Sequence, residues 1–86
     1  MEISEIQYIP IKPKDGCYGF VSFILNQELY IGSVAIHSRL DGSIRLVWPT
    51  LNTRGIKHAT VHPISKELGQ GIEKIIYDYI KQLLPI

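Results

Sequence analysis

Up to Val61, short apolar segments alternate with polar residues, and glycine, proline or asparagine separates the segments. Alternation with a period of two is typical of β-strands that bury one face. The pattern predicts four strands followed by a shorter fifth one. Their expected ranges are Glu2–Ile11, Cys17–Leu25, Leu29–Ser38, Ser43–Trp48 and Ile56–Val61.

The links between the first four segments have the composition of tight turns. Asp15-Gly16 and Asp41-Gly42 are hairpin signals, because glycine readily adopts the positive φ that such turns require. Asn26-Gln27 joins the second segment to the third. Strands joined by such short links pair in antiparallel fashion, so we expect a β-meander.

The third segment is unusual because simple alternation places apolar residues on both of its faces. One face would carry Leu29, Ile31, Ser33 and Ala35, and the other Tyr30, Val34 and Ile36. A strand that is apolar on both faces is expected to be central in a sheet or to form half of an interface.

After His62-Pro63 the apolar spacing changes to that of an amphipathic helix. The apolar positions are Leu68, Ile72, Ile75, Ile76, Tyr79, Ile80 and Leu83. Ser65 is the expected N-cap, since its hydroxyl can accept a hydrogen bond from an amide of the first turn. The fold class is therefore predicted as α+β: an antiparallel β-meander sheet of four to five strands with one C-terminal amphipathic helix packed on one face.

The size and composition favour a single small domain over residues 1–86. With 45% hydrophobic and 20% charged residues, the chain is typical of a globular protein. A domain this small buries a modest share of its surface, so we expect a homodimer, formed by strand pairing across a two-fold axis. The lone Cys17 excludes an internal disulfide framework and a cysteine-based zinc site. We expect a cytoplasmic protein without a signal peptide or membrane span.

The residues give little support for catalysis. Cys17 has no nucleophile signature around it and is expected to be a buried structural thiol. His58 and His62 are four residues apart, but in an extended chain their Cα atoms would be about 13 Å apart, too far to share a metal. We therefore expect no enzyme, cofactor, metal or small-molecule substrate.

Nucleic-acid binding is supported by a local cluster, although the net charge is only +1. Arg54, Lys57 and His58 fall in the connection before the helix, and Lys66 opens the helix. A helix N-terminus offers unpaired amides, so these four residues are the candidate contacts to DNA or RNA. The alternative interpretation is an ordinary solvated loop.

The order of several fragments resembles the bacterial SpoVG family, the stage V sporulation protein G or septation regulators. The fragments are Met1-Glu2-Ile3-Ser4-Glu5-Ile6, Ser22-Phe23-Ile24-Leu25-Asn26, Glu28-Leu29, Trp48-Pro49-Thr50 and His62-Pro63-Ile64-Ser65. The last is similar to the family's His-Pro-Ile-Asn before its helix. The resemblance implies a small dimeric α+β protein that binds DNA and RNA and is linked to septation, sporulation and gene regulation.

The chain departs from the family at the positions that the resemblance assigns to nucleic-acid contact. Leu51 and Asn52 align with a family Lys-Arg, and Gly69 and Gly71 align with basic positions of the first helical turns. A protein-interaction or assembly module that has lost nucleic-acid binding is therefore the second hypothesis.

Overall fold

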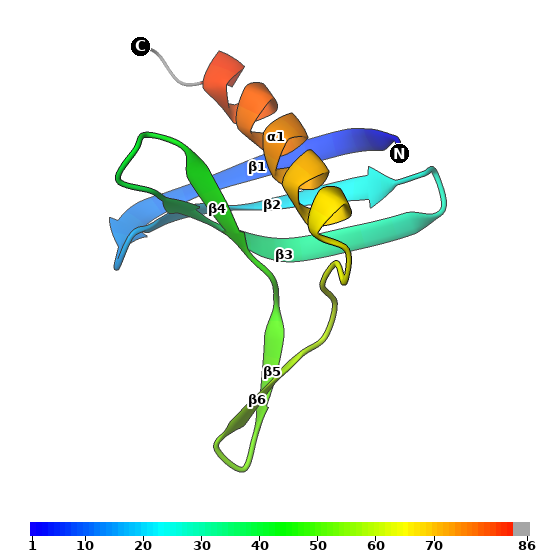
Figure 1. Cartoon of the computed structure of the whole chain (residues 1–86). Coiled ribbons are helices and arrows are strands. Elements are labelled where there is room, and N and C mark those ends of the chain that lie inside the picture. The colour runs from blue at the N-terminus through cyan, green and yellow to red at the C-terminus, as the bar shows by residue number, and fades with distance from the viewer. Residues whose placement is uncertain (84–86) are drawn as a thin grey trace.

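A four-stranded antiparallel sheet forms the body of the protein (Figure 1). The structure is a computed structural model and describes residues 1–83. The strands are β1 (Ile3–Lys14), β2 (Cys17–Leu25), β3 (Leu29–Ser38) and β4 (Ile44–Val47). Their spatial order equals their order in the chain, so the predicted meander is confirmed.

The predicted turns are also confirmed. Asp15 and Gly16 have φ of 53° and 86°, and Asn26 and Gln27 have φ of 53° and 58°. Positive φ at both central residues matches the right-handed twist of the flanking strands. At the third turn Gly42 has φ of 89°, and its amide donates to the Arg39 carbonyl at 3.1 Å.

β3 is a central strand of the sheet, as expected. The predicted division of its residues between the two faces is wrong, because a bulge reverses its alternation. Val34 pairs with Val21, and Ile31 pairs with Phe23, so one extra residue lies on β3 between the two pairs. Ser33 absorbs it with a φ of 60°. As a result Ile31 and Val34 lie on the same, inner face, and both are buried.

The helix α1 (Lys66–Leu83) covers that inner face. Ile72, Ile76 and Ile80 are buried and pack with the inward residues of the sheet. Those residues are Val21, Phe23, Ile31, Val34, Ile36, Ile44 and Leu46. The Leu68 amide donates to the Ser65 hydroxyl at 3.1 Å, which confirms the predicted N-cap. The α+β class, with one helix on one face of an antiparallel sheet, is thus confirmed.

The fifth predicted strand does not join this sheet. β6 (Ile56–Ala59) pairs instead with β5 (Thr50–Thr53), and the two form a separate two-stranded sheet. Pro49 follows β4 and has no amide hydrogen to donate, so it ends the ladder there and the chain leaves the sheet. Within residues 1–83, no helix has the length and apolar character required to cross a membrane.

Candidate nucleic-acid interface

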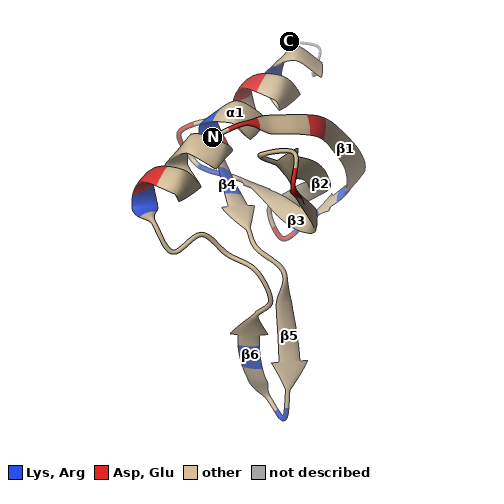
Figure 2. Cartoon of the chain, turned by 90° about the vertical axis from the view of Figure 1, so that its right-hand side faces the viewer, with Lys and Arg blue, Asp and Glu red and all other residues tan. Residues whose placement is uncertain are grey.

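The hairpin of β5 and β6 projects from the body, and we call its residues 50–59 the hairpin arm (Figures 1 and 2). All ten of its residues are exposed. Among the helices and strands of residues 1–83, β5 and β6 contact only each other. Arg54 and Gly55 form the tip, with φ of 53° and 81°, the conformation of a two-residue hairpin turn.

The register of the arm separates its side chains into two faces. Leu51 lies opposite His58, and Thr53 lies opposite Ile56, so these four share one face. Asn52 lies opposite Lys57 on the other face, beside the pair Thr50 and Ala59. The arm therefore has a more apolar face, with Leu51 58% and Ile56 60% exposed, and a polar face that carries Lys57.

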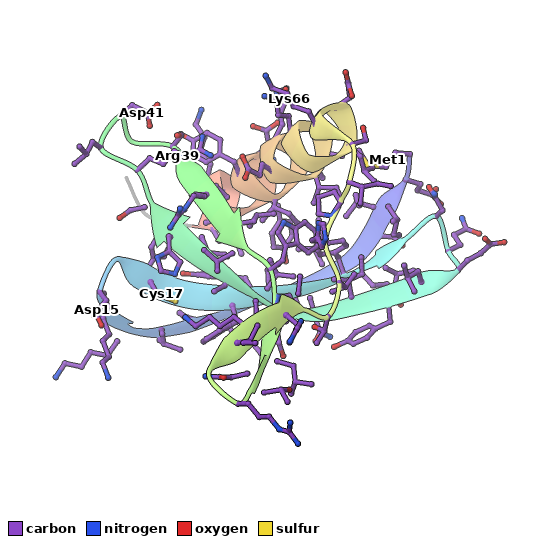
Figure 3. All side chains as sticks on the ribbon, turned by 60° about the horizontal axis from the view of Figure 1, so that its bottom comes forward. Met1, Asp15, Cys17, Arg39, Asp41 and Lys66 are labelled. Atoms are coloured by element: carbon purple, nitrogen blue, oxygen red, sulfur yellow. The ribbon has the colours of Figure 1, made fainter. Side chains whose placement is uncertain are left out.

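This arrangement places three of the four predicted site residues on one element. Arg54 stands at the tip, Lys57 on the polar face and His58 on the apolar face of the arm. Lys66 is not on the arm, because it opens α1, which does not contact β5 or β6. Figure 3 shows Lys66 beside the helix start and pointing away from the arm.

The arm carries basic residues and no acidic one, which the net charge alone does not show. Between Asp41 and Glu67 the chain contains four Lys or Arg residues and no acidic residue; Arg54 and Lys57 lie on the arm, Arg45 on β4 and Lys66 at the helix start. The arm in Figure 2 shows blue segments and no red ones, whereas both colours occur on the body. This uninterrupted basic segment is the sequence signal by which the arm can be recognised.

The start of α1 is already partnered by groups of the protein. Ser65 caps Leu68, and the Ser65 hydroxyl donates to the Glu67 carboxylate at 3.1 Å. The pKa of Glu67 lies below its usual value because its carboxylate accepts first from its own backbone amide and then from Ser65. A carboxylate thus already lies at the positive end of the helix dipole, which disfavours a second anion there.

A cleft of about 530 Å³ runs from the helix start to Trp48, which directly follows β4. Lys66, His62 and Trp48 line it, together with Arg39 and Glu73. Arg39 is paired with Glu73 at 3.4 Å, so part of the basic charge in the cleft is neutralised. We therefore place the main candidate interface on the arm rather than in this cleft.

Other chemistry is sparse. Within residues 1–83, no group of three or more His, Cys, Asp or Glu side chains is arranged to hold a metal ion. Cys17 is half-buried, not fully buried as expected, and its Sγ lies 3.6 Å from the Gly19 carbonyl oxygen.

No family model, curated protein or solved structure matches this chain.

Proposed function

We propose that the chain is a small dimeric nucleic-acid-binding regulatory protein of the SpoVG type, linked to septation, sporulation and gene regulation in the cytoplasm. The observation that carries the proposal is the projecting two-stranded arm with Arg54 at its tip and Lys57 on its polar face. The major groove of B-DNA, about 12 Å wide, admits a two-stranded β-ribbon.

Each basic residue of the arm has a distinct role in this proposal. Arg54 reaches base edges, where a guanidinium can donate two hydrogen bonds to guanine. Lys57 contacts phosphate as a point charge. His58 and Lys66 make secondary contacts, because His58 lies on the opposite face of the arm from Lys57 and Lys66 lies at the helix start.

The shape of the arm favours duplex DNA over duplex RNA. The major groove of A-form RNA is deep and narrow, and side chains cannot read it. The family resemblance covers both nucleic acids, so single-stranded RNA remains a ligand to compare. A direct comparison of the four nucleic-acid types at two salt concentrations tests this preference.

The decisive experiment replaces the arm's basic residues and measures both affinity and salt dependence. Removing one phosphate contact to B-DNA lowers the slope of log K against log salt by about 0.9. We expect Lys57→Gln to lower the slope by about two per dimer, and Arg54→Gln to weaken sequence preference. Lys81→Gln removes the same charge from the last turn of α1, far along the chain from the arm, and serves as the control.

A protein-interaction or assembly module is the second candidate. The exposed Leu51 and Ile56 of the arm support it. This candidate predicts no binding to any nucleic acid, even at about 50 mM salt, where phosphate contacts are strongest. Salt-sensitive binding that Lys57→Gln weakens and Lys81→Gln preserves would rule it out.

A further inference from the structure

The face of the four-stranded sheet that points away from α1, here called the outer face, is not covered by any helix or strand of residues 1–83. Register pairs place Ile9 opposite Phe20, Phe20 opposite Ala35, and Ile24 opposite Tyr30 on this face. Ile9 is 58% and Tyr30 69% exposed. Gln7, Ser22 and Ser33 lie between the group of Ile9 and Phe20 and the group of Ile24 and Tyr30. Exposed apolar residues of this kind mark an interaction surface.

The outer face is also hollowed. A cavity of about 340 Å³ opens on it, lined by Gln7, Ile9, Phe20, Tyr30 and Ser33 among others. An apolar cavity of about 150 Å³ holds a benzene molecule. The hollow is therefore large enough to receive two aliphatic side chains.

The hairpin arm, in turn, has an apolar face that no other helix or strand of residues 1–83 covers. A two-stranded hairpin on its own is at best marginally stable in water, and this one has no contact with another strand or helix of residues 1–83. Its apolar face presents Leu51 and Ile56 to solvent. Packing of its apolar face against another surface would stabilise the arm. Its own sheet does not provide that surface, because the arm points away from it (Figure 1).

The total surface shows how much area is available for burial. The chain exposes 6313 Å² at 9.8 kDa, whereas a compact monomer of that mass exposes about 5,200 Å². The radius of gyration is 13.1 Å, against about 12 Å for a compact chain of this length. The excess is about 1,100 Å² per chain, or about 2,200 Å² for two, slightly more than a standard stable interface.

We propose that two copies of this chain form an arm-exchanged dimer, in which the hairpin arm of each copy lies across the outer face of the other. Leu51 and Ile56 then occupy the hollow beside Ile9 and Tyr30. The occupant is a second copy because the arm and the surface that fits it are on the same chain, and a two-fold axis buries both of them twice.

This dimer differs from one formed by edge-to-edge strand pairing. One edge strand of the sheet, β1, contains Pro10 and Pro13, which lack amide hydrogens. The other edge strand, β4, has only four residues. Neither edge is well suited to pairing with a strand of a second copy. In the arm-exchanged dimer the polar face with Lys57 and the tip with Arg54 stay outside the interface. His58 shares the covered face with Leu51 and Ile56, so in this dimer it does not contact nucleic acid. The inference specifies the dimer of the proposed function and does not depend on nucleic-acid binding.

The first test measures mass by light scattering, without nucleic acid, at micromolar concentration. We expect a dimer for the wild type and a monomer for the double variant Leu51→Ser, Ile56→Ser, with the dimer dissociation constant raised at least about a hundredfold. Both side chains are already exposed in the single chain, so the helix signal in circular dichroism should be preserved. Leu40→Ser, at the exposed turn after β3, should remain dimeric.

The second test identifies the contact. In a Cys17→Ser background, chains with Ile56→Cys are mixed with chains with Tyr30→Cys and oxidised. We expect a disulfide between the two kinds of chain, and none when Leu40→Cys replaces Tyr30→Cys. A monomeric wild type, a double variant that stays dimeric, or Tyr30→Cys chains that cross-link only to each other would overturn the proposal. A failure of nucleic-acid binding would leave all three measurements unchanged.

Discussion

The substitution Gly19→Ala tests how tightly β1 and β2 are packed, because the added methyl group would meet atoms of β1. Gly19 is buried and pairs with Pro10 on β1. A Cβ added there would overlap the Tyr8 ring and would lie 3.0 Å from the Ile9 carbonyl oxygen. The ring can move aside, but the carbonyl belongs to the backbone of a paired strand. We therefore expect Gly19→Ala to lower the free energy of unfolding by about 1–3 kcal/mol.

A double-mutant cycle separates the two contacts. In a Tyr8→Ala background the ring is absent, and the new methyl group meets only the Ile9 carbonyl. The cost of Gly19→Ala should then fall below about 1 kcal/mol, which is a coupling within the range seen for residues in contact. Urea unfolding measures all four proteins, and equal m-values show that the unfolded states are comparable.

The size of this effect is easily measured. A domain of this length has a total stability of about 4–13 kcal/mol, so the substitution removes a large share of it. A cost of Gly19→Ala below about 0.5 kcal/mol, or an equal cost with and without the Tyr8 ring, would show that Tyr8 does not pack closely on Gly19.

Two further predictions concern other parts of the fold. Gly71→Ala should raise the free energy of unfolding by up to about 1 kcal/mol in urea, because alanine favours helix and the added methyl meets only the flexible end of Met1, at 3.0 Å. A loss of stability would contradict this reasoning. Asp41 accepts hydrogen bonds from the Ser43 hydroxyl and amide, at 2.6 Å and 2.9 Å, and these bonds lower its pKa below its usual 3.8. Its contribution is therefore present above pH 3.8 and lost as pH falls through the folded-state pKa, so the stability difference between wild type and Asp41→Ala should shrink below about pH 4. A stability difference between wild type and Asp41→Ala that grows on acidification would contradict the expected direction of this pH dependence.

The strands and the helix could be predicted because their signals are local. The turn residues Asp15-Gly16 and Asn26-Gln27 fix the hairpins by their own backbone preferences, and Ser65 starts the helix by a bond within one turn. The bulge at Ser33 is different. It depends on which residues of β2 lie opposite, so alternation along β3 alone cannot reveal it.

The candidate site could be predicted only in part for a related reason. Arg54 and Lys57 stood out by charge, but the arm that carries them forms by pairing of Leu51 with His58 and of Asn52 with Lys57. Neither strand of the arm buries a face, so the alternation that marks a half-buried strand is weak in β5. Lys57 and His58 are adjacent, so alternation within β6 alone places them on opposite faces. Which β5 residues share each face emerges only once the two strands are aligned.

Positive and negative charges are distributed unevenly along the chain, which matters for the proposed function of the arm. The segment between Asp41 and Glu67 holds four of the nine Lys and Arg residues, and the remaining five must balance all eight acidic residues elsewhere. The rest of the chain is therefore net negative, whereas the arm carries Arg54 and Lys57 and no acidic residue. In the proposed function, this charge distribution would orient the molecule during approach, so that an arm would meet the nucleic acid first. A near-neutral net charge is thus compatible with an oriented, salt-sensitive interaction, provided that the arm is where the positive charge is presented.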